Sequence, residues 1–324
     1  MLLSCLAPFS VVPAAADPPV ALEVVSRALT GFAPGVGLGG RIGRLEFRGG
    51  LELSSPFAGF GGMSGLRFDE TGTRLLAVTD KGLWLRGRLE TEGDRPLGLV
   101  EMVAAPILGT DGRPLARQGR GDVEALTRTP DGWAIGIERR QEIWRFTGPD
   151  PLTVRGRPVA TGRMLEGLGY NAGIEGLAAA MLGTPPRSGL VAVAEKSPML
   201  PNELPGFLFG AGRPGRFVLA RSGDFAATDL ALGPADMLYL LERRYSPWQG
   251  VALRIRRFPL AAVQGAAPIV GETLIEIGMS AQIDNMEGLA VHANAAGETI
   301  LTLISDNNFS AIQRNLLLRF AVVD

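Results

Sequence analysis

The chain has 324 residues, of which 46% are hydrophobic and 20% are charged, a balance typical of a compact globular protein. Its net charge of −1 gives no electrostatic basis for binding nucleic acid or an anionic membrane. The 44 glycines and 23 prolines supply frequent turns, which favours many short strands over long helices.

The first residues have the pattern of an export signal. An apolar run from Leu2 to Val12 precedes Ala14-Ala15-Ala16-Asp17, whose small residues suit a cleavage site. The run is too short to cross a bilayer as a helix, so no transmembrane segment is expected. We predict an export signal over residues 1–16, an N-terminal extension over 17–40 and a periplasmic or secreted protein. Lipid attachment at Cys5 is the less favoured alternative.

The rest of the chain is predicted to consist of strands. Residues 41–55 alternate apolar and polar side chains, as half-buried strands do. Five two-strand cassettes follow, opening at Ser64, Glu124, Glu175, Asp229 and Glu287, which are 60, 51, 54 and 58 residues apart. A Pro/Gly-rich stretch over 198–214 is interpreted as an insertion. Repeats of this period filled with strands are typical of β-propeller blades.

The repeat predicts how the ring closes. The last cassette has room for only about three strands, while the strands at 41–55 have no partner in the series. We therefore predict one all-β domain over residues 41–324, a single β-propeller in which 41–55 pairs with 316–322. Five blades account for the chain, and six are the alternative.

Acidic residues recur at both ends of the cassettes. A short antiparallel turn joins the two strands, so the start of the first and the end of the second lie at one sheet edge. The residues that open the cassettes are thus expected at one mouth of the central channel, beside Asp80, Glu138, Glu195, Glu242 and Asp306. Crowded carboxylates favour a hard divalent cation, and Ca²⁺ suits such oxygen ligands best. The predicted metal ligands are Glu124, Glu175, Glu287, Asp80, Glu138, Glu195 and Asp306.

Basic residues follow most of the acids at the strand ends. Lys81, Arg139, Lys196 and Arg243 each stand directly after one of them. A metal among acids with cations at its rim is what hydrolysis of a phosphate ester would use. The alternative is that acid and base form ordinary ion pairs between blades.

Several motifs resemble the phytase-like family, whose bacterial members are named for an esterase-like activity of phytase. They are Gly61-Gly62-Met63-Ser64-Gly65-Leu66, Asp122-Val123-Glu124-Ala125-Leu126, Gly173-Ile174-Glu175-Gly176-Leu177-Ala178, Asn285-Met286-Glu287-Gly288-Leu289 and Ser305-Asp306-Asn307-Asn308-Phe309. The resemblance spans about residues 41–322 and implies a β-propeller that hydrolyses phosphate or other esters. Ser64 stands where other cassettes have an acid, and Asp229 lacks the following Gly-Leu.

Two classes of function follow. One is an exported hydrolase that depends on a divalent cation, with Ca²⁺ favoured, and acts on a small anionic ester, a phosphate ester before a carboxyl ester. Glu175, Glu124 and Glu287 are its candidate catalytic residues, and Lys81, Arg139, Lys196, Arg243 and Asn307 its candidate substrate-binding residues. The other is a non-catalytic propeller that Ca²⁺ stabilises and that serves as a binding module. The chain is expected to be a monomer.

A serine-esterase mechanism is disfavoured. The only histidine, His292, is expected in a strand of the last cassette and away from its opener, so a Ser-His-Asp triad has no evident base. The tryptophans Trp84, Trp133, Trp144 and Trp248 are interpreted mainly as packing between blades.

Overall fold

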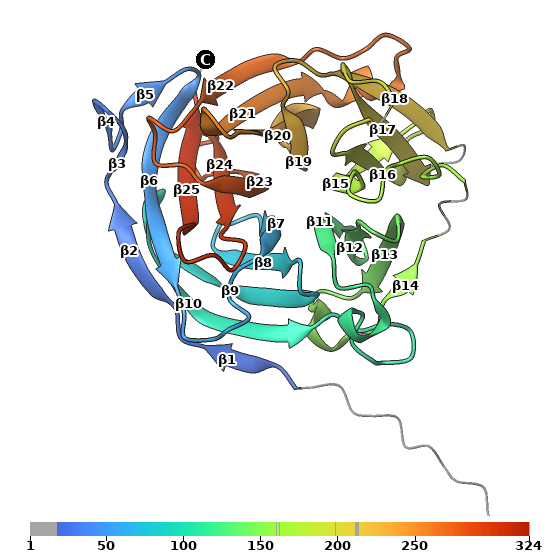
Figure 1. The fold of residues 1–324 in the computed structure, drawn as a ribbon, viewed down its shortest axis with the longest axis horizontal. Helices are drawn as coiled ribbons and strands as arrows, with labels where there is room; N and C mark the ends of the chain where they lie inside the picture. Colours follow the sequence, from blue (N-terminus) through green and yellow to red (C-terminus); the bar gives the residue numbers. More distant parts are fainter. Residues whose placement is uncertain (1–17, 160, 162, 198, 211–213, 324) are drawn as a thin grey trace, which may run out of the picture.

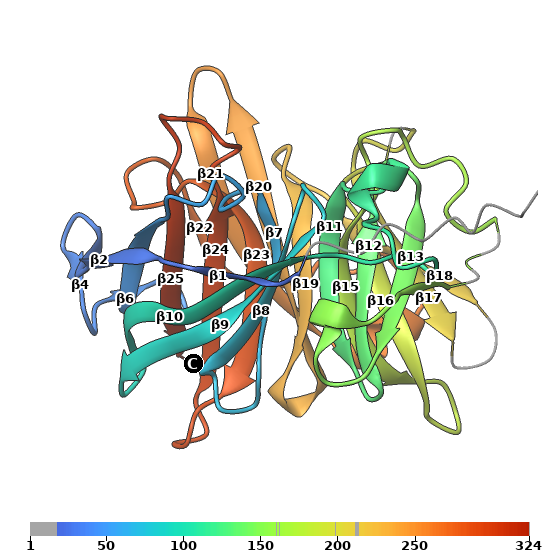
Figure 2. The ribbon, with the colours of Figure 1, turned by 90° about the horizontal axis from the view of Figure 1, so that it is seen from below.

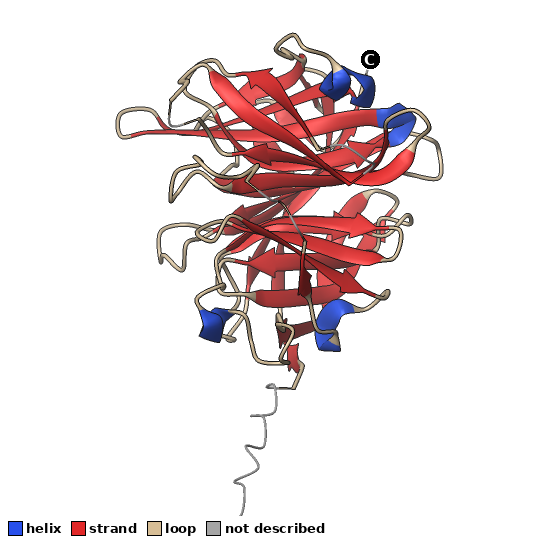
Figure 3. Cartoon of the chain, turned by 90° about the vertical axis from the view of Figure 1, so that its right-hand side faces the viewer, coloured by secondary structure: helices blue, strands red, loops and turns tan. Residues whose placement is uncertain are grey.

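The computed structural model describes residues 18–159, 161, 163–197, 199–210 and 214–323, so the predicted export signal lies outside the described residues. Five antiparallel sheets surround a central axis as the blades of a propeller, and one strand of each sheet lies innermost (Figure 1). Strands make up nearly the whole framework, and the helices are short turns between them (Figure 3). The prediction of a single five-bladed β-propeller is confirmed.

The innermost strands follow one another around the ring in chain order. They are β7 (Met63–Phe68), β11 (Val123–Thr129), β15 (Ile174–Leu182), β19 (Ala226–Gly233) and β23 (Asn285–Ala293).

The other strands extend each blade outward from the axis. In the first blade they are β8 (Arg74–Thr79), β9 (Leu83–Glu92), β10 (Arg95–Pro106) and β1 (Val20–Leu22), and in the second they are β12 (Gly132–Ile137), β13 (Glu142–Thr147) and β14 (Arg157–Pro158). In the third they are β16 (Arg187–Ala194), β17 (Glu203–Gly210) and β18 (Gly215–Ala220), and in the fourth they are β20 (Met237–Ser246), β21 (Gly250–Pro259) and β22 (Glu272–Ile277). In the fifth they are β24 (Thr299–Asp306), β25 (Asn315–Val322), β6 (Leu45–Ser54) and β2 (Val25–Leu29), with β5 (Arg41–Ile42) paired to β6.

The smaller elements lie outside these ladders. They are the hairpin β3 (Gly31–Ala33) with β4 (Val36–Gly37), and the short 3₁₀ helices η1 (Ala116–Gln118), η2 (Pro151–Thr153), η3 (Pro234–Asp236) and η4 (Leu260–Gln264). Among the described residues, no helix combines the length and the apolar character that a membrane span requires.

Pairing of the two ends of the chain closes the ring. Strand β6 runs antiparallel to β25, with Leu53 opposite Asn315 and Leu45 opposite Val322, which confirms the predicted closure. Strands β1 and β2 extend the first and fifth blades, so residues of the predicted extension belong to the sheets. The interpretation of 198–214 as an insertion is wrong for its central part, because residues 203–210 form β17 between β16 and β18.

Apolar side chains fill the spaces between neighbouring blades. Trp84, Trp133 and Trp144 are buried in the cluster that joins the first two blades, where Trp84 meets Phe146 edge to face at 5.1 Å between ring centroids. These three tryptophans pack as expected, whereas the side chain of Trp248 is 95% exposed.

Every inner strand carries a one-residue β-bulge at the same height. The residues of the inner strands that have no partner in the ladder are Ser64, Glu124, Glu175, Thr228 and Glu287. A bulge bends its strand and redirects the extra side chain. The five equivalent bulges therefore define one ring of positions near one end of the axis.

A buried ion pair occupies the axis beneath this ring. The Arg67 guanidinium donates to both carboxylate oxygens of Asp229, at 2.8 and 2.9 Å. It also donates to four main-chain carbonyl groups, those of Leu66, Leu177, Leu230 and Leu289. Asp229 in turn accepts hydrogen bonds from the backbone N–H groups of Leu230 and Leu289. One pair of side chains thus ties together four of the five inner strands.

Replacing Arg67 with methionine is expected to lower the free energy of unfolding by about 3–5 kcal/mol, because the fully buried Asp229 would lose its partner. The measurement is equilibrium unfolding in urea. Arg27→Met, which breaks an exposed pair with Glu52, should leave the midpoint nearly unchanged. Equal, small effects of both substitutions would contradict the role assigned to the buried pair.

Candidate functional site

The ring of bulges opens into a cavity of about 390 Å³ at one end of the axis, which we call the acidic mouth. Eight carboxylates and three basic side chains line it together with two asparagines. The lining residues are Asp80, Asp122, Glu124, Glu138, Glu175, Glu195, Glu287 and Asp306; Arg139, Lys196 and Arg243; and Asn171 and Asn308. All seven acids predicted as metal ligands lie in this one cavity.

Two structural positions supply most of these acids. Glu124, Glu175 and Glu287 are the bulge residues of their inner strands. Asp80, Glu138, Glu195 and Asp306 lie at or just beyond the ends of the paired second strands, at the same edge of each sheet. The hairpin geometry expected from the sequence therefore brings both sets together.

The fourth blade departs from the prediction. Asp229 and Glu242 were expected at the mouth, but both are fully buried elsewhere. Asp229 lies on the axis with Arg67, and Glu242 accepts four hydrogen bonds from Arg254 and Arg256 within the blade.

The reason for this departure is a register one residue away from the one assumed. The bulge residue of the fourth blade is Thr228, and Arg243 holds the position that Asp80, Glu138, Glu195 and Asp306 hold in the other blades. Successive side chains on a strand face opposite ways, so a shift of one residue moves both acids off the mouth.

The two hydroxyl residues of the bulge ring join neighbouring blades. Ser64 was also expected at the mouth, but its hydroxyl donates to the carbonyl of Val123, just before the bulge of the next blade. Thr228 donates in the same way to the carbonyl of Met286, at 3.1 Å. Only the three glutamates of the ring therefore line the acidic mouth.

Burial and mutual repulsion raise the pKa values of these acids. Burial, with a smaller contribution from Glu287, raises the pKa of Glu124 well above its usual range, and burial with Glu124 does the same for Glu175. Burial raises the pKa of Glu138 and of Glu287 to about 7, and that of Asp306 to about 6. The cluster thus holds protons, or another source of positive charge, near neutral pH.

One part of the cluster has the spacing of a metal site. Carboxylate oxygens of Asp122, Glu124 and Glu138 all lie within 4.8 Å of one another. A buried oxygen of Asp80 accepts no hydrogen bond from the described residues, whereas an oxygen of Asp122 lies 2.8 Å from the Arg139 guanidinium. Converging carboxylate oxygens are what a hard cation such as Ca²⁺ coordinates, so the residues present fit such an ion.

The predicted basic residues lie in or beside the acidic mouth. Arg243 approaches Glu287 at 3.2 Å, Lys196 approaches Glu195 at 3.1 Å, and Arg139 approaches Asp122 at 2.8 Å.

Two further predicted substrate-binding residues, Lys81 and Asn307, are not among the residues that line the cavity. The ammonium of Lys81 lies 3.7 Å from Asp80 and 4.9 Å from the centre of the Phe309 ring. The side-chain oxygen of Asn307 accepts a hydrogen bond from the backbone N–H of Phe309. Asn308, the residue after Asn307, lines the cavity instead.

Three lining residues were missed as site residues. Asp122 lies two residues before Glu124, and this short spacing at the start of an inner strand could have indicated a shared face. Asn171 comes from the connection before β15, and Asn308 follows Asp306 in the β24–β25 connection. Neither asparagine belongs to a repeated position, so the repeat gave no signal for them.

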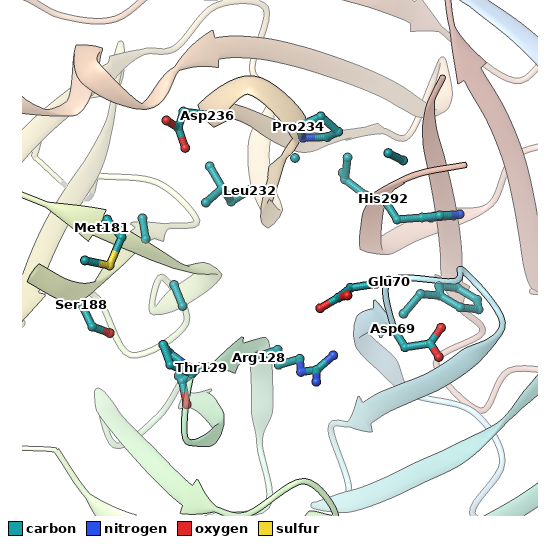
Figure 4. Close-up of a pocket in the computed structure, with 17 residues that line it drawn as sticks. Asp69, Glu70, Arg128, Thr129, Met181, Ser188, Leu232, Pro234, Asp236 and His292 are labelled. Atoms are coloured by element: carbon teal, nitrogen blue, oxygen red, sulfur yellow. The ribbon is translucent and has the colours of Figure 1, made fainter. Parts of the chain in front are cut away.

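A second cavity, of about 720 Å³, lies at the opposite mouth. Figure 4 shows Glu70 and Arg128 beside this opening and the His292 imidazole directed away from its centre. Burial lowers the pKa of His292 to about 4, so the ring is neutral above that pH. His292 therefore supplies no base to the acidic mouth, as the sequence indicated.

Comparisons with known proteins identify the family. The family model described as "Phytase-like: Esterase-like activity of phytase" matches residues 58–309. The search of curated proteins finds no match. Among solved structures, the chain is similar to the Dos1 propeller, with 12% identity and a TM-score of 0.37 over 77% of this chain and 54% of that one. It is similar to U3-55K with 10% identity and a TM-score of 0.39 over 82% of this chain and 96% of that one. It is also similar to the alpha-L-arabinofuranosidase PaAbf62A from Podospora anserina in complex with cellotriose, with 10% identity and a TM-score of 0.46 over 82% of this chain and 93% of that one.

These structural likenesses are too remote to bear on function, and the chain spans about half the length of the Dos1 propeller chain that it matches. The family model, by contrast, covers most of this sequence and includes all the lining residues of the acidic mouth. The chain belongs to the phytase-like family.

Proposed function

We propose that the protein is an exported hydrolase that binds Ca²⁺ in the acidic mouth and cleaves a phosphate ester there. The observation that carries this proposal is the convergence of eight carboxylates, several with raised pKa values, beside three basic side chains in one open cavity. The family's esterase-like description supports an ester as the substrate. A phosphate ester is favoured over a carboxyl ester because the basic groups suit an anion.

The cation would be held by the predicted ligands, Glu124, Glu175, Glu287, Asp80, Glu138, Glu195 and Asp306, together with Asp122. The spacing of Asp122, Glu124 and Glu138 favours this side of the mouth for a first ion. A bound divalent cation would supply charge neutralisation and a lower pKa for a water molecule.

The side chains of the mouth have complementary roles in this proposal. Arg139, Lys196 and Arg243 bind and orient the anionic group, and Lys81 attracts it at the rim. Glu175, Glu124 and Glu287 line the centre of the cavity, and a carboxylate with a pKa near 7, such as Glu287, can accept a proton from water at neutral pH.

A specific observation favours the alternative of a non-catalytic, Ca²⁺-stabilised binding propeller. Each basic side chain of the mouth already approaches an acid, as in the Arg243–Glu287 and Lys196–Glu195 pairs. If such pairs are static, the mouth needs no anionic substrate. Ca²⁺ binding without turnover of any phosphomonoester, phosphodiester or carboxyl ester would favour this second function.

Substituting Glu175→Gln is expected to weaken Ca²⁺ binding by about tenfold or more and to reduce ester hydrolysis in parallel, because it removes one charge and keeps the shape. Isothermal titration with Ca²⁺ and an ester assay with and without EDTA measure the two effects. Glu70→Gln, at the opposite mouth, is the matched control and should change neither. Unchanged Ca²⁺ affinity in the Glu175 variant would contradict the site.

Lys196→Ala is expected to raise KM for a phosphate ester roughly tenfold, since it removes one charge-assisted contact with the anion. Its Ca²⁺ affinity should stay close to that of the wild type. Arg128→Ala at the opposite mouth is the control and should leave KM unchanged. A loss of kcat with an unchanged KM would argue against a substrate-binding role.

Calcium is expected to stabilise the fold more at pH 8 than at pH 5. Burial raises the pKa of Glu138 and Glu287 from 4.5 to about 7, so the folded metal-free protein binds these protons more tightly than the unfolded chain. The contribution of these two protonated carboxyl groups to the stability of the folded protein is fully present below pH 4.5 and is lost as the pH rises through about 7. A bound cation offsets the repulsion of the ionised form.

The measurement for this pH dependence is Tm with Ca²⁺ and with EDTA at each pH. A Ca²⁺-induced rise in Tm that is equal at both values would show that these carboxyls are not the ligands.

A further inference from the structure

Large apolar side chains surround the acidic mouth. They lie near the end of β20, on the connections β16–β17, β20–β21 and β24–β25, and on the loop before β15, which all meet at this face. We call these residues the apolar rim: Tyr170, Met199, Tyr245, Trp248, Phe309 and Ile312. The most exposed are Trp248 at 95%, Ile312 at 91% and Met199 at 84%.

The rim projects away from the body of the propeller. Figure 2 shows the β20–β21 hairpin, which bears Trp248 near its tip, as the highest point of the upper face. The β24–β25 connection, which bears Ile312, rises on the same side. Single exposed apolar residues are common, but side chains from three blades projecting around one opening need a partner that spans them.

Basic groups lie between the apolar rim and the cavity. The Lys81 ammonium lies 4.9 Å from the centre of the Phe309 ring, and the Arg139 guanidinium lies 5.7 Å from that of Tyr170. These contacts hold positive charge at the inner edge of the rim. Both cations also approach acids of the mouth, Lys81 approaching Asp80 and Arg139 approaching Asp122, and an anionic group that meets the rim can contact them there.

A phospholipid bilayer fits this arrangement better than a protein partner does. A stable protein interface is a continuous patch of about 800 Å² on each partner, whereas the rim is interrupted by the charged mouth. Tryptophan and tyrosine favour the headgroup level of bilayers, where the ring is buried and its polar atom stays hydrated. The net charge of −1 provides no long-range attraction, so the contact depends on the apolar tips.

We propose that the apolar rim docks the acidic mouth against a phospholipid bilayer. Trp248, Ile312 and Met199 enter the headgroup region, and Lys81 and Arg139 contact lipid phosphates beside the cavity. The docking itself does not require catalysis. That the ester reaching the mouth is a lipid headgroup rests on the proposed function.

The tryptophans make this docking directly measurable. Trp84, Trp133 and Trp144 are buried, so a change in tryptophan emission on addition of phosphatidylcholine vesicles reports chiefly on Trp248. We expect a blue shift of the emission and sedimentation of the protein with the vesicles. Trp248→Ala should abolish the shift and weaken binding about tenfold, as should Ile312→Ser without loss of the fluorophore.

A matched pair of methionines tests whether the rim itself is responsible. Met199→Ala should weaken vesicle binding, whereas Met181→Ala should not, because Met181 is 55% exposed at the opposite mouth. Glu175→Gln should bind vesicles like the wild type, which separates docking from the proposed metal site.

Three outcomes would overturn the proposal. They are no binding to vesicles of phosphatidylcholine alone or mixed with phosphatidylglycerol, equal losses in both methionine variants, and an emission shift produced by raising the protein concentration alone. The last outcome would identify a second copy of the chain as the occupant of the rim.

Discussion

The buried Arg67–Asp229 pair is the interaction on which the arrangement of the propeller axis depends. A ring of inner strands leaves main-chain carbonyls facing a narrow space, and buried polar groups need partners. The six donor contacts of Arg67 satisfy four such carbonyls and one carboxylate at once. Burial raises the pKa of Asp229, and the adjacent guanidinium opposes that shift. The acidic mouth and the opposite cavity share no lining residue.

The sequence predicted the fold and most of the acidic mouth because both depend on the repeat. The period located the blades, the unpaired strands at 41–55 located the closure, and hairpin geometry located the acids of four blades. The prediction of the site was wrong in the fourth blade, where Asp229 and Glu242 lie one residue away from the positions that the repeated acids occupy in the other blades. The bulge that sets the register depends on backbone pairing, which residue types alone do not show.

The acidic mouth combines two tendencies that usually oppose each other. Carboxylates such as Glu124 and Glu175 are crowded and partly desolvated, which disfavours their ionised forms. Basic side chains at the edge, Arg243 among them, approach the same acids and favour ionisation. The strands and the residues just beyond their ends place both sets of groups in one cavity. The ionisation of each carboxylate therefore depends on that of its neighbours.

The pairing of β6 with β25 has a consequence for the order of biosynthesis. The two strands are separated by roughly 260 residues, so β6 leaves the ribosome long before its neighbour exists. Until then one backbone edge of β6 is open, and open edges invite pairing with other chains. Contacts this distant in sequence also form slowly. A nascent or truncated chain that lacks β25 thus exposes an unpaired edge of β6, which can pair with other chains and which β25 covers in the complete ring.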